Sequence, residues 1–217
     1  MLIWGHHALM AVPQAERAER MRERLLDATI ECLATTGYGL MSTNDVVRTA
    51  GVSRGALAHH FPTKTDLVTA AAIRLLAQRE ADFRARFSAL APADRTPAVA
   101  LDVLWSFYAD PSGIALLELT VAARSHPELK DVLAPMTKQI EASTADVFGE
   151  YFPDLARLPI AEPALRAIYA LFAGLTVTSM GGDSHGDEVR EFLKTLVAFS
   201  DLLIPLLPDQ LLAGSSA

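Results

Sequence analysis

The segment STNDVVRTAGVSRGALAHHF, residues 42–61, constrains the fold more than any other part of the chain. It contains two short helical patterns separated by a turn at Gly51, Val52 and Ser53. Ala50 is small enough to let two helices cross closely, and Gly51 has no Cβ to oppose a left-handed turn. Val52 can fill the turn from the apolar side, and Ser53 is a favoured helix N-cap. The segment therefore predicts a helix-turn-helix, in which a second short helix is held across a first.

Helical spacing on either side of this turn separates a buried face from an exposed one. Ser42 or Thr43 is expected to cap the first helix, and Asp45 in its first turn suits the positive end of the helix dipole. Leu57 and Phe61 of the second helix are four residues apart and are expected to face the core. The residues left on its outward face are Arg54, Gly55, Ala58, His59 and His60.

Helical patterns continue along the chain, which is rich in Ala and Leu and modest in Val, Ile and aromatic residues. Residues 14–36 form one amphipathic pattern that ends at Gly37, and a longer pattern runs from Thr63 or Thr65 to Leu90. Further helices are expected at 98–109, 112–125, 128–151, 163–180 and 187–206, with a loop at 153–163. We predict an all-α fold.

Charge is unevenly distributed along the chain. The formal net charge is −7. Residues 14–70 carry seven Lys/Arg and seven Asp/Glu, and residues 71–217 carry twelve and nineteen. The acidity therefore belongs to the larger C-terminal part, so the N-terminal part is free to present a local positive face to phosphate.

Several classes of protein are disfavoured by the composition. The single cysteine, Cys32, excludes an intramolecular disulfide and lies within the pattern at 14–36, which favours a buried apolar role. Residues 1–13 have no periodic pattern and are expected to form a flexible leader, without the basic and long apolar regions of a signal peptide. Because no run of about 18 uninterrupted apolar residues occurs, we expect a cytoplasmic protein without a membrane span.

The helix-turn-helix and the FPTKTDL that follows it resemble the N-terminal signature of the TetR family of transcription regulators. The resemblance covers residues 22–70 and implies a DNA-binding domain at 14–66 and an effector-binding and dimerisation domain at 67–217. It places Thr43 and Lys64 on DNA phosphates. It also places Ser53, Arg54, Gly55, His59 and His60 on the face that reads DNA. Ala58 departs from the family, which commonly has Tyr there, so one DNA contact is expected to be missing.

The resemblance further implies a homodimer that uses the last two long helices, and a small, largely apolar effector that binds the middle helices. Both final helical patterns carry wide apolar surfaces, which is consistent with a partner surface. The candidate effector-binding residues are Phe83, Phe87, Leu104, Trp105, Tyr108, Glu118, Arg124, Met136, Phe148, Tyr169, Thr176 and Met180. The competing interpretation is that most of these residues only pack the core.

Two other functions stay open at this point. A helical ligand-binding or interaction protein could keep this fold and lose DNA binding, an alternative that Ala58 and the neutral N-terminal part favour. An α-helical enzyme is disfavoured because the sequence lacks a P-loop, a dinucleotide fingerprint, G-x-S-x-G and H-E-x-x-H. The segment GGDSHGDE contains possible metal ligands, but its glycines and lack of apolar residues are typical of an exposed loop. We expect no cofactor and no metal.

Overall fold

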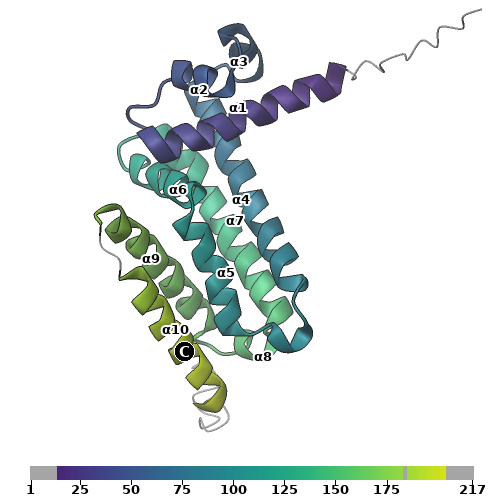
Figure 1. Cartoon of the computed structure of the whole chain (residues 1–217), viewed down its shortest axis with the longest axis vertical. Helices are drawn as coiled ribbons and strands as arrows, with labels where there is room; N and C mark the ends of the chain where they lie inside the picture. Colours follow the sequence, from purple (N-terminus) through teal and green to yellow (C-terminus); the bar gives the residue numbers. More distant parts are fainter. Residues whose placement is uncertain (1–13, 183–184, 204–217) are drawn as a thin grey trace, which may run out of the picture.

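The computed structural model describes residues 14–182 and 185–203. Within these ranges the chain is helical without strands, which confirms the predicted all-α fold. In Figure 1, α1 lies across the top with α2 and α3 above it, and longer helices run downward below them. The helices are α1 (Gln14–Thr36), α2 (Thr43–Ala50), α3 (Arg54–His60), α4 (Lys64–Ser88), α5 (Pro97–Ala109), α6 (Pro111–Ala122), α7 (Pro127–Tyr151), α8 (Pro153–Ala156), α9 (Ala161–Met180) and α10 (Gly186–Leu203), with a 3-10 turn η1 (Pro92–Asp94).

Helices α1, α2 and α3 form an upper unit whose ends follow the predicted signals. Gly37 has a φ of 77°, a left-handed conformation that ends the chain's first helix without strain. Ser42 caps α2, and its backbone N–H donates to Asp45 Oδ2 at 2.9 Å, which completes a capping box. Gly51 follows α2 with a φ of 62°, and Ser53 caps α3. The predicted helix-turn-helix is therefore present.

A buried apolar cluster ties the upper unit to the helices beneath it. Its members from α1, α2 and α3 pack on residues of α4, α6 and α7. The larger of them are Leu25, Leu26, Leu33, Val46, Leu57, Phe61, Leu67, Val68, Leu75, Leu119 and Leu129. Because burying one such side chain contributes about 1.5–3 kcal/mol, the cluster holds α2 and α3 firmly against α1 and α4.

Helix α4 is shared by the upper unit and the lower bundle. Leu67 and Leu75 in its first half belong to the upper cluster, while Phe87 near its end packs with Ala100 and Phe152 in a second cluster. Thr63 caps this helix with a side chain that accepts from the backbone N–H of Asp66 at 3.0 Å. Helix α4 therefore connects the apolar cluster of the upper unit to that of the lower bundle.

The loop predicted at 153–163 is wrong. Pro153 begins the short helix α8, and α9 already begins at Ala161, with Pro163 in its first turn. Proline has no N–H, but the first turn of a helix has no acceptor for that group, so proline is tolerated there. The prolines at this place begin helices and do not interrupt them.

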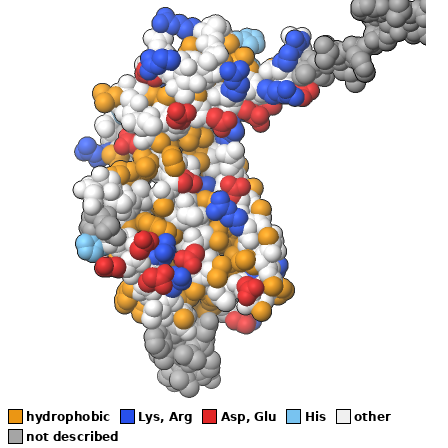
Figure 2. All heavy atoms as spheres, in the orientation of Figure 1, with side chains coloured by type: hydrophobic (Ala, Val, Ile, Leu, Met, Phe, Trp, Pro, Cys, Tyr) orange, Lys and Arg blue, Asp and Glu red, His pale blue; other side chains and the backbone are white. Residues whose placement is uncertain are grey.

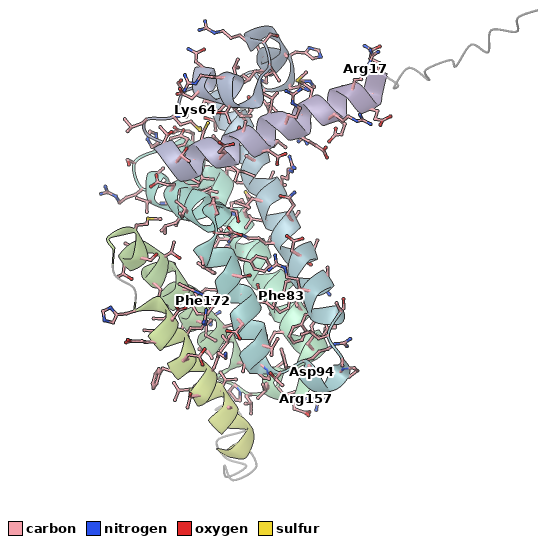
Figure 3. The ribbon with its side chains drawn as sticks, viewed as in Figure 1. Arg17, Lys64, Phe83, Asp94, Arg157 and Phe172 are labelled. Atoms are coloured by element: carbon pink, nitrogen blue, oxygen red, sulfur yellow. The ribbon has the colours of Figure 1, made fainter. Side chains whose placement is uncertain are left out.

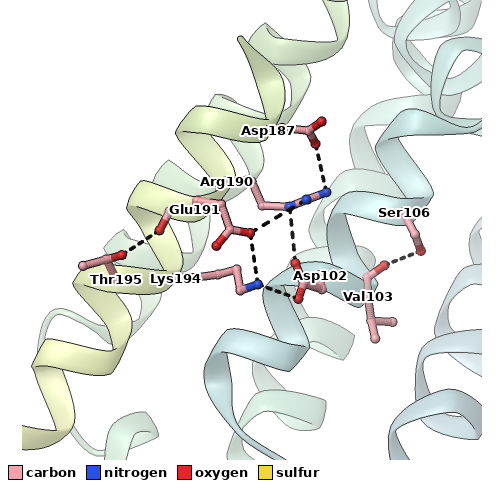
Figure 4. A network of polar contacts seen from close by, with 8 residues as sticks. All are labelled: Asp102, Val103, Ser106, Asp187, Arg190, Glu191, Lys194 and Thr195. Carbon is pink, nitrogen blue, oxygen red and sulfur yellow. Dashed lines mark hydrogen bonds and ion pairs between the residues drawn. The ribbon is translucent and has the colours of Figure 1, made fainter. Parts of the chain in front are cut away.

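Helix α10 is held on α5 by charges as well as by apolar contacts (Figure 4). Asp102 of α5 accepts ion pairs from Lys194 at 3.0 Å and from Arg190 at 3.4 Å. Asp187 and Glu191 pair with the same two cations along α10. The two carboxylates nearest to Lys194, those of Asp102 and Glu191, raise its pKa. This network directs one face of α10 toward α5, while Phe192 and Leu196 of the same helix stay exposed.

Candidate nucleic-acid interface

The turn between α2 and α3 is anchored by an arginine of α1. The Arg24 guanidinium donates to the carbonyl oxygen of Ala50 at 2.6 Å and to that of Gly51 at 3.4 Å. Carbonyls at the end of a helix lack partners within the helix, so these bonds satisfy groups that would otherwise be free. Sequence reasoning missed Arg24, because nothing in the order of residues indicates that α1 passes the turn at this point.

The outward face of α3 contains most of the predicted reading residues. Ser53, Arg54, Gly55 and His59 are exposed, and Leu57 is buried on the opposite face. The Ser53 hydroxyl accepts a hydrogen bond from the backbone N–H of Ala56 at 3.1 Å. This hydroxyl therefore serves as the N-cap of α3. Arg54 makes no ion pair with any residue of the described ranges. An exposed helix face with an unpaired guanidinium can meet either base edges or phosphates.

The two histidines of α3 differ in exposure. His59 is exposed, while the ring of His60 is half-buried, with its centroid 5.4 Å from that of His59 and 6.4 Å from that of Phe61. Ala58 is exposed beside them and offers a methyl group to a partner. His59 is thus the better placed of the two for an external contact.

Lys64 is held at the base of the helix-turn-helix by Tyr38. Its Nζ donates to the Tyr38 carbonyl oxygen at 2.6 Å and lies 4.1 Å from the centroid of the Tyr38 ring. Burial lowers the pKa of Lys64. An ammonium has three hydrogens, so two remain after the bond to Tyr38. Thr43 is the first residue of α2 and is half-buried.

Positive side chains gather on the upper unit, as the local charge balance allows. Figure 2 shows Lys and Arg over the top of the molecule and at the projecting end of α1, with acidic side chains along the edge below. Arg17 and Lys64 lie at the two ends of this region in Figure 3. A surface of this kind attracts a polyanion even though the whole chain is acidic.

The candidate effector-binding residues do not share one pocket. Phe83, Phe87 and Phe148 belong to the second apolar cluster, whereas Leu104, Trp105 and Tyr108 border a third, formed around Leu101, Phe172 and Leu175. Tyr169 and Thr176 of α9 lie beside this third cluster and are held by hydrogen bonds. Tyr169 Oη donates to Thr144 Oγ1 at 3.0 Å, and Thr176 Oγ1 donates to the Tyr108 carbonyl oxygen at 3.2 Å. Met136 packs on the upper cluster, and Arg124 is exposed at the end of α6.

Glu118 and Met180 line a hollow between the upper unit and the lower bundle. The hollow has a volume of about 440 Å³ and is bordered by Ala34, Thr35, Thr36, Gly37, Gly39, Leu40, Ile114, Glu118 and Met180. It is open to solvent, and Leu40 on its rim is 82% exposed. The hollow lies apart from both aromatic clusters, so these two residues form a group of their own.

Helices α9 and α10 leave an apolar surface uncovered. Leu171, Val177 and Met180 of α9 are exposed, as are Phe192 and Leu196 of α10. By length and composition α9 would qualify for a membrane span, and only 17% of that stretch is buried within the described part of the chain, so most of the helix faces outward. Exposed apolar area on this scale is typical of a surface that another protein covers.

The described ranges contain no group of three or more His, Cys, Asp or Glu side chains suited to a metal ion. Cys32 is buried within α1, as its position in the helical pattern predicts, and it forms no disulfide. Asp183 and Ser184 of the GGDSHGDE segment, and the leader at 1–13, lie outside the described residues.

Comparison with known proteins agrees with this geometry. Residues 25–71 match the family model described as bacterial regulatory proteins of the tetR family. An uncharacterized HTH-type transcriptional regulator of Mycobacterium tuberculosis is 37% identical over 152 residues, which cover 67% of this chain and 77% of that protein. The HTH-type transcriptional regulator CymR of Pseudomonas putida is 39% identical over 118 residues, or 54% of this chain and 58% of that protein.

A solved structure from Rhodococcus sp., described as a TetR-family transcriptional regulator, has the same fold. Its TM-score is 0.68 at 22% identity, over 83% of this chain and 98% of that chain. The family match falls on α1 to α4, where the helix-turn-helix and its anchors lie. The chain therefore belongs to the TetR family of bacterial regulatory proteins, whose members are DNA-binding regulators of transcription.

Proposed function

We propose that the chain is a homodimeric, ligand-responsive repressor that binds a palindromic operator through α3. The observation that carries the proposal is the outward face of α3, where Ser53, Arg54, Gly55 and His59 are exposed together. A helix presented in this way fits the major groove, where base edges are distinguishable. Residues 14–66 are the DNA-binding domain, and residues 67–217 bind the effector and the second copy.

The predicted DNA-binding residues are proposed to divide into base contacts and phosphate contacts. Arg54 donates to a guanine edge or to a phosphate. Thr43 and Lys64 donate to phosphates on either side of the groove, Lys64 with the hydrogens that Tyr38 does not accept. His59 contacts the DNA more closely than His60, because the His60 ring is half-buried.

The second copy is proposed to cover the exposed apolar face of α9 and α10. A dimer formed there would present two copies of α3, and a regulator of this kind needs them about 34–36 Å apart to enter successive major grooves. The small residues Ala170 and Gly174 are exposed on α9 and would let the partner's helices approach closely.

An effector bound among the aromatic residues of the lower bundle would act through α4. This helix begins beside the helix-turn-helix at Lys64 and ends in the second aromatic cluster at Phe87. An effector that favours one position of α4 weakens DNA binding, and DNA weakens effector binding by the same factor. The relatives are regulators of transcription, so we propose that the chain acts by binding, without catalysis, and in the cytoplasm where its DNA lies.

The test is a mobility-shift titration of the intergenic DNA upstream of the chain's own gene. Arg54→Ala is expected to weaken binding about tenfold or more, because one base contact contributes about 1–3 kcal/mol. Lys64→Ala is expected to weaken binding of all DNA sequences to a similar extent and to reduce the salt dependence, because a phosphate contact releases a counterion.

Arg157→Ala is the matched control, since Arg157 is an exposed arginine at the opposite end of the molecule (Figure 3). Unchanged binding by Arg54→Ala would remove the assignment of the reading face. Wild-type binding that is absent, or that does not depend on salt, would favour the alternative of a helical interaction protein without DNA affinity.

A further inference from the structure

The hollow between the upper unit and the lower bundle is bordered by the C-terminal end of α1. Figure 1 shows this end of α1 above α6, with the end of α9 below it. Residues 34–37 of α1, Ile114 and Glu118 of α6 and Met180 of α9 all line the same hollow. Its volume of about 440 Å³ lies within the range of ligand sites, about 300–1,000 Å³. Because the hollow is open to solvent, a small molecule can enter it without any opening of the fold.

Carbonyl groups at the end of α1 lack partners beside this hollow. The last four carbonyls of a helix have no donor within the helix. Among residues 33–36 of α1, the carbonyl of Leu33 is satisfied by the backbone N–H of Gly37 at 3.1 Å. No described residue beyond the helix donates to the carbonyl oxygens of Ala34, Thr35 or Thr36. The last turn of α1 also contains no basic residue. The helix therefore ends in free acceptors, with the negative end of its dipole unbalanced.

The charged side chain that borders the hollow beside this helix end is also negative. Glu118 lies against Gly37, since a Cβ added to that glycine would stand 2.9 Å from Glu118 Oε2. Glu118 is half-buried, and its carboxylate makes no hydrogen bond or ion pair with any residue of the described ranges. No Lys, Arg or His is among the described residues that border the hollow. A carboxylate at the C-terminal end of a helix is unfavourable, and a cation placed between them would remove that cost.

The other walls of the hollow are apolar. Leu40 on the rim is 82% exposed, and Met180 is 49% exposed. Ile114 stands four residues before Glu118 on α6, so both lie on one face of that helix. Met180 ends α9, so the hollow lies at the edge of the surface proposed for the second copy. An apolar group that lies against these walls would leave water together with them.

We propose that this hollow binds a protonated alkylamine, with Glu118 as its counter-charge. The ammonium group lies between the Glu118 carboxylate and the carbonyl oxygens that end α1, and its N–H groups donate to both. The alkyl chain lies against Ile114, Leu40 and Met180. The site is additional to the aromatic residues of the lower bundle. It rests on the proposed function only for its regulatory meaning, because a bound amine would touch both α1 of the upper unit and α6 below it.

This chemistry separates amines from other ligands of the same shape. A primary ammonium has three N–H donors and is protonated at neutral pH, like the side chain of lysine. A quaternary ammonium has the charge but no N–H group, so it leaves the carbonyls of α1 without donors. An alcohol leaves Glu118 without a counter-charge, and Glu118 repels a carboxylate.

The test is isothermal titration calorimetry of the full chain at constant ionic strength. The probes are hexylammonium, hexyltrimethylammonium, hexanol and hexanoate, which share one six-carbon chain. Hexylammonium is expected to bind saturably at millimolar concentration or below. The other three are expected to bind about tenfold more weakly or not at all, because charge-assisted hydrogen bonds are about twice as strong as neutral ones. Butylammonium is expected to bind up to about fourfold more weakly than hexylammonium for each methylene that the hollow no longer covers.

Glu118→Gln keeps the shape of the side chain and removes its charge. It is expected to weaken the binding of hexylammonium about tenfold or more and to remove most of the preference over hexanol. The matched control is Glu23→Gln, which removes the same charge from an exposed position on α1. Glu23 is about 20 Å from the end of that helix, beyond the reach of a screened charge.

Circular dichroism checks that each variant is folded. Leu40→Ser carries the test if Glu118→Gln is not folded, because an exposed rim residue contributes little to the core. Leu40→Ser is expected to reduce the difference in affinity between hexylammonium and butylammonium.

The proposal is overturned if hexylammonium shows no saturable binding, or if hexanol or hexyltrimethylammonium binds as tightly. It is also overturned if Glu23→Gln weakens binding as much as Glu118→Gln. Mobility shifts with the same preparations separate this result from the proposed function. A protein that binds DNA but no amine loses only the assignment of the hollow. A protein that binds amines through Glu118 but binds no DNA loses only the proposed repressor role.

Discussion

At the scale of single residues, the corner between α5 and α6 depends on a glycine. A Cβ on Gly113 would lie 2.5 Å from the Tyr108 carbonyl oxygen and 2.6 Å from that of Phe107. Both atoms belong to the backbone, which cannot move aside without displacing α5. The same corner holds Arg79, whose Nη2 donates to the Phe107 carbonyl oxygen and to Ser112 Oγ.

Gly113→Ala is therefore expected to lower the free energy of unfolding by about 3 kcal/mol, the upper end of the usual cost of overpacking. Gly149→Ala in α7 is the control, because its Cβ would meet Ala156 at an ordinary 4.0 Å and alanine favours a helix by up to about 1 kcal/mol. Urea unfolding followed by circular dichroism compares the two. Equal stabilities would show that the corner can relax.

At the scale of elements, helix starts are determined by side chains within one turn. Ser42 with Asp45 at α2, and Thr63 with Asp66 at α4, form reciprocal capping boxes. In the first of these boxes, hydrogen bonds from Ser42 and Arg48 lower the pKa of Asp45 to about 2. The charged form of Asp45 is thus the form that the folded chain prefers.

This shift predicts how the stability of α2 depends on pH. The folded pKa of Asp45 lies below its ordinary value of 3.8, so its stabilising contribution is present above about pH 4 and is lost as pH falls toward 2. Asp45→Asn should be less stable than wild type at neutral pH, and the difference should shrink between pH 4 and 2. Thermal melts over this range check it, with Asp154→Asn on the exposed helix α8 as control. A difference that does not change with pH would contradict the role given to the charge.

At the scale of the whole molecule, α9 and α10 leave an apolar surface uncovered within the described residues. The ion pairs of Asp102 with Arg190 and Lys194 hold α10 on α5, so Phe192 and Leu196 are left facing outward. Apolar area of this extent is costly in water unless a partner covers it. A second copy of the chain, as proposed, would cover this surface and remove that cost.

Phe192→Glu is expected to convert a dimer into a monomer and to abolish a stable mobility shift, because a charge placed in an apolar interface loses its hydration. Ile73→Glu is the matched control, since Ile73 is 54% exposed and Phe192 is 60% exposed, but Ile73 lies on α4 away from α9 and α10. Light scattering coupled to gel filtration measures the mass. A monomeric wild type, or a dimeric Phe192→Glu, would contradict the interface.

The sequence by itself determined the helices, the helix-turn-helix and the family, because caps, turn glycines and apolar periodicity are interactions between residues a few positions apart. Ser42, Gly51 and Ser53 act as predicted for that reason. The loop expected at 153–163 was wrong because prolines begin helices as readily as they end them.

Only the tertiary structure decided which distant side chains meet. It directs Arg24 to the turn, Lys64 to Tyr38 and Arg79 to the α5–α6 corner, none of which the order of residues indicates. It also divides the candidate effector residues among two aromatic clusters and a separate hollow. Contacts of this kind depend on how whole helices pack, so the half-buried position of Arg79 at the α5–α6 corner follows only from the way α4 lies against α5 and α6.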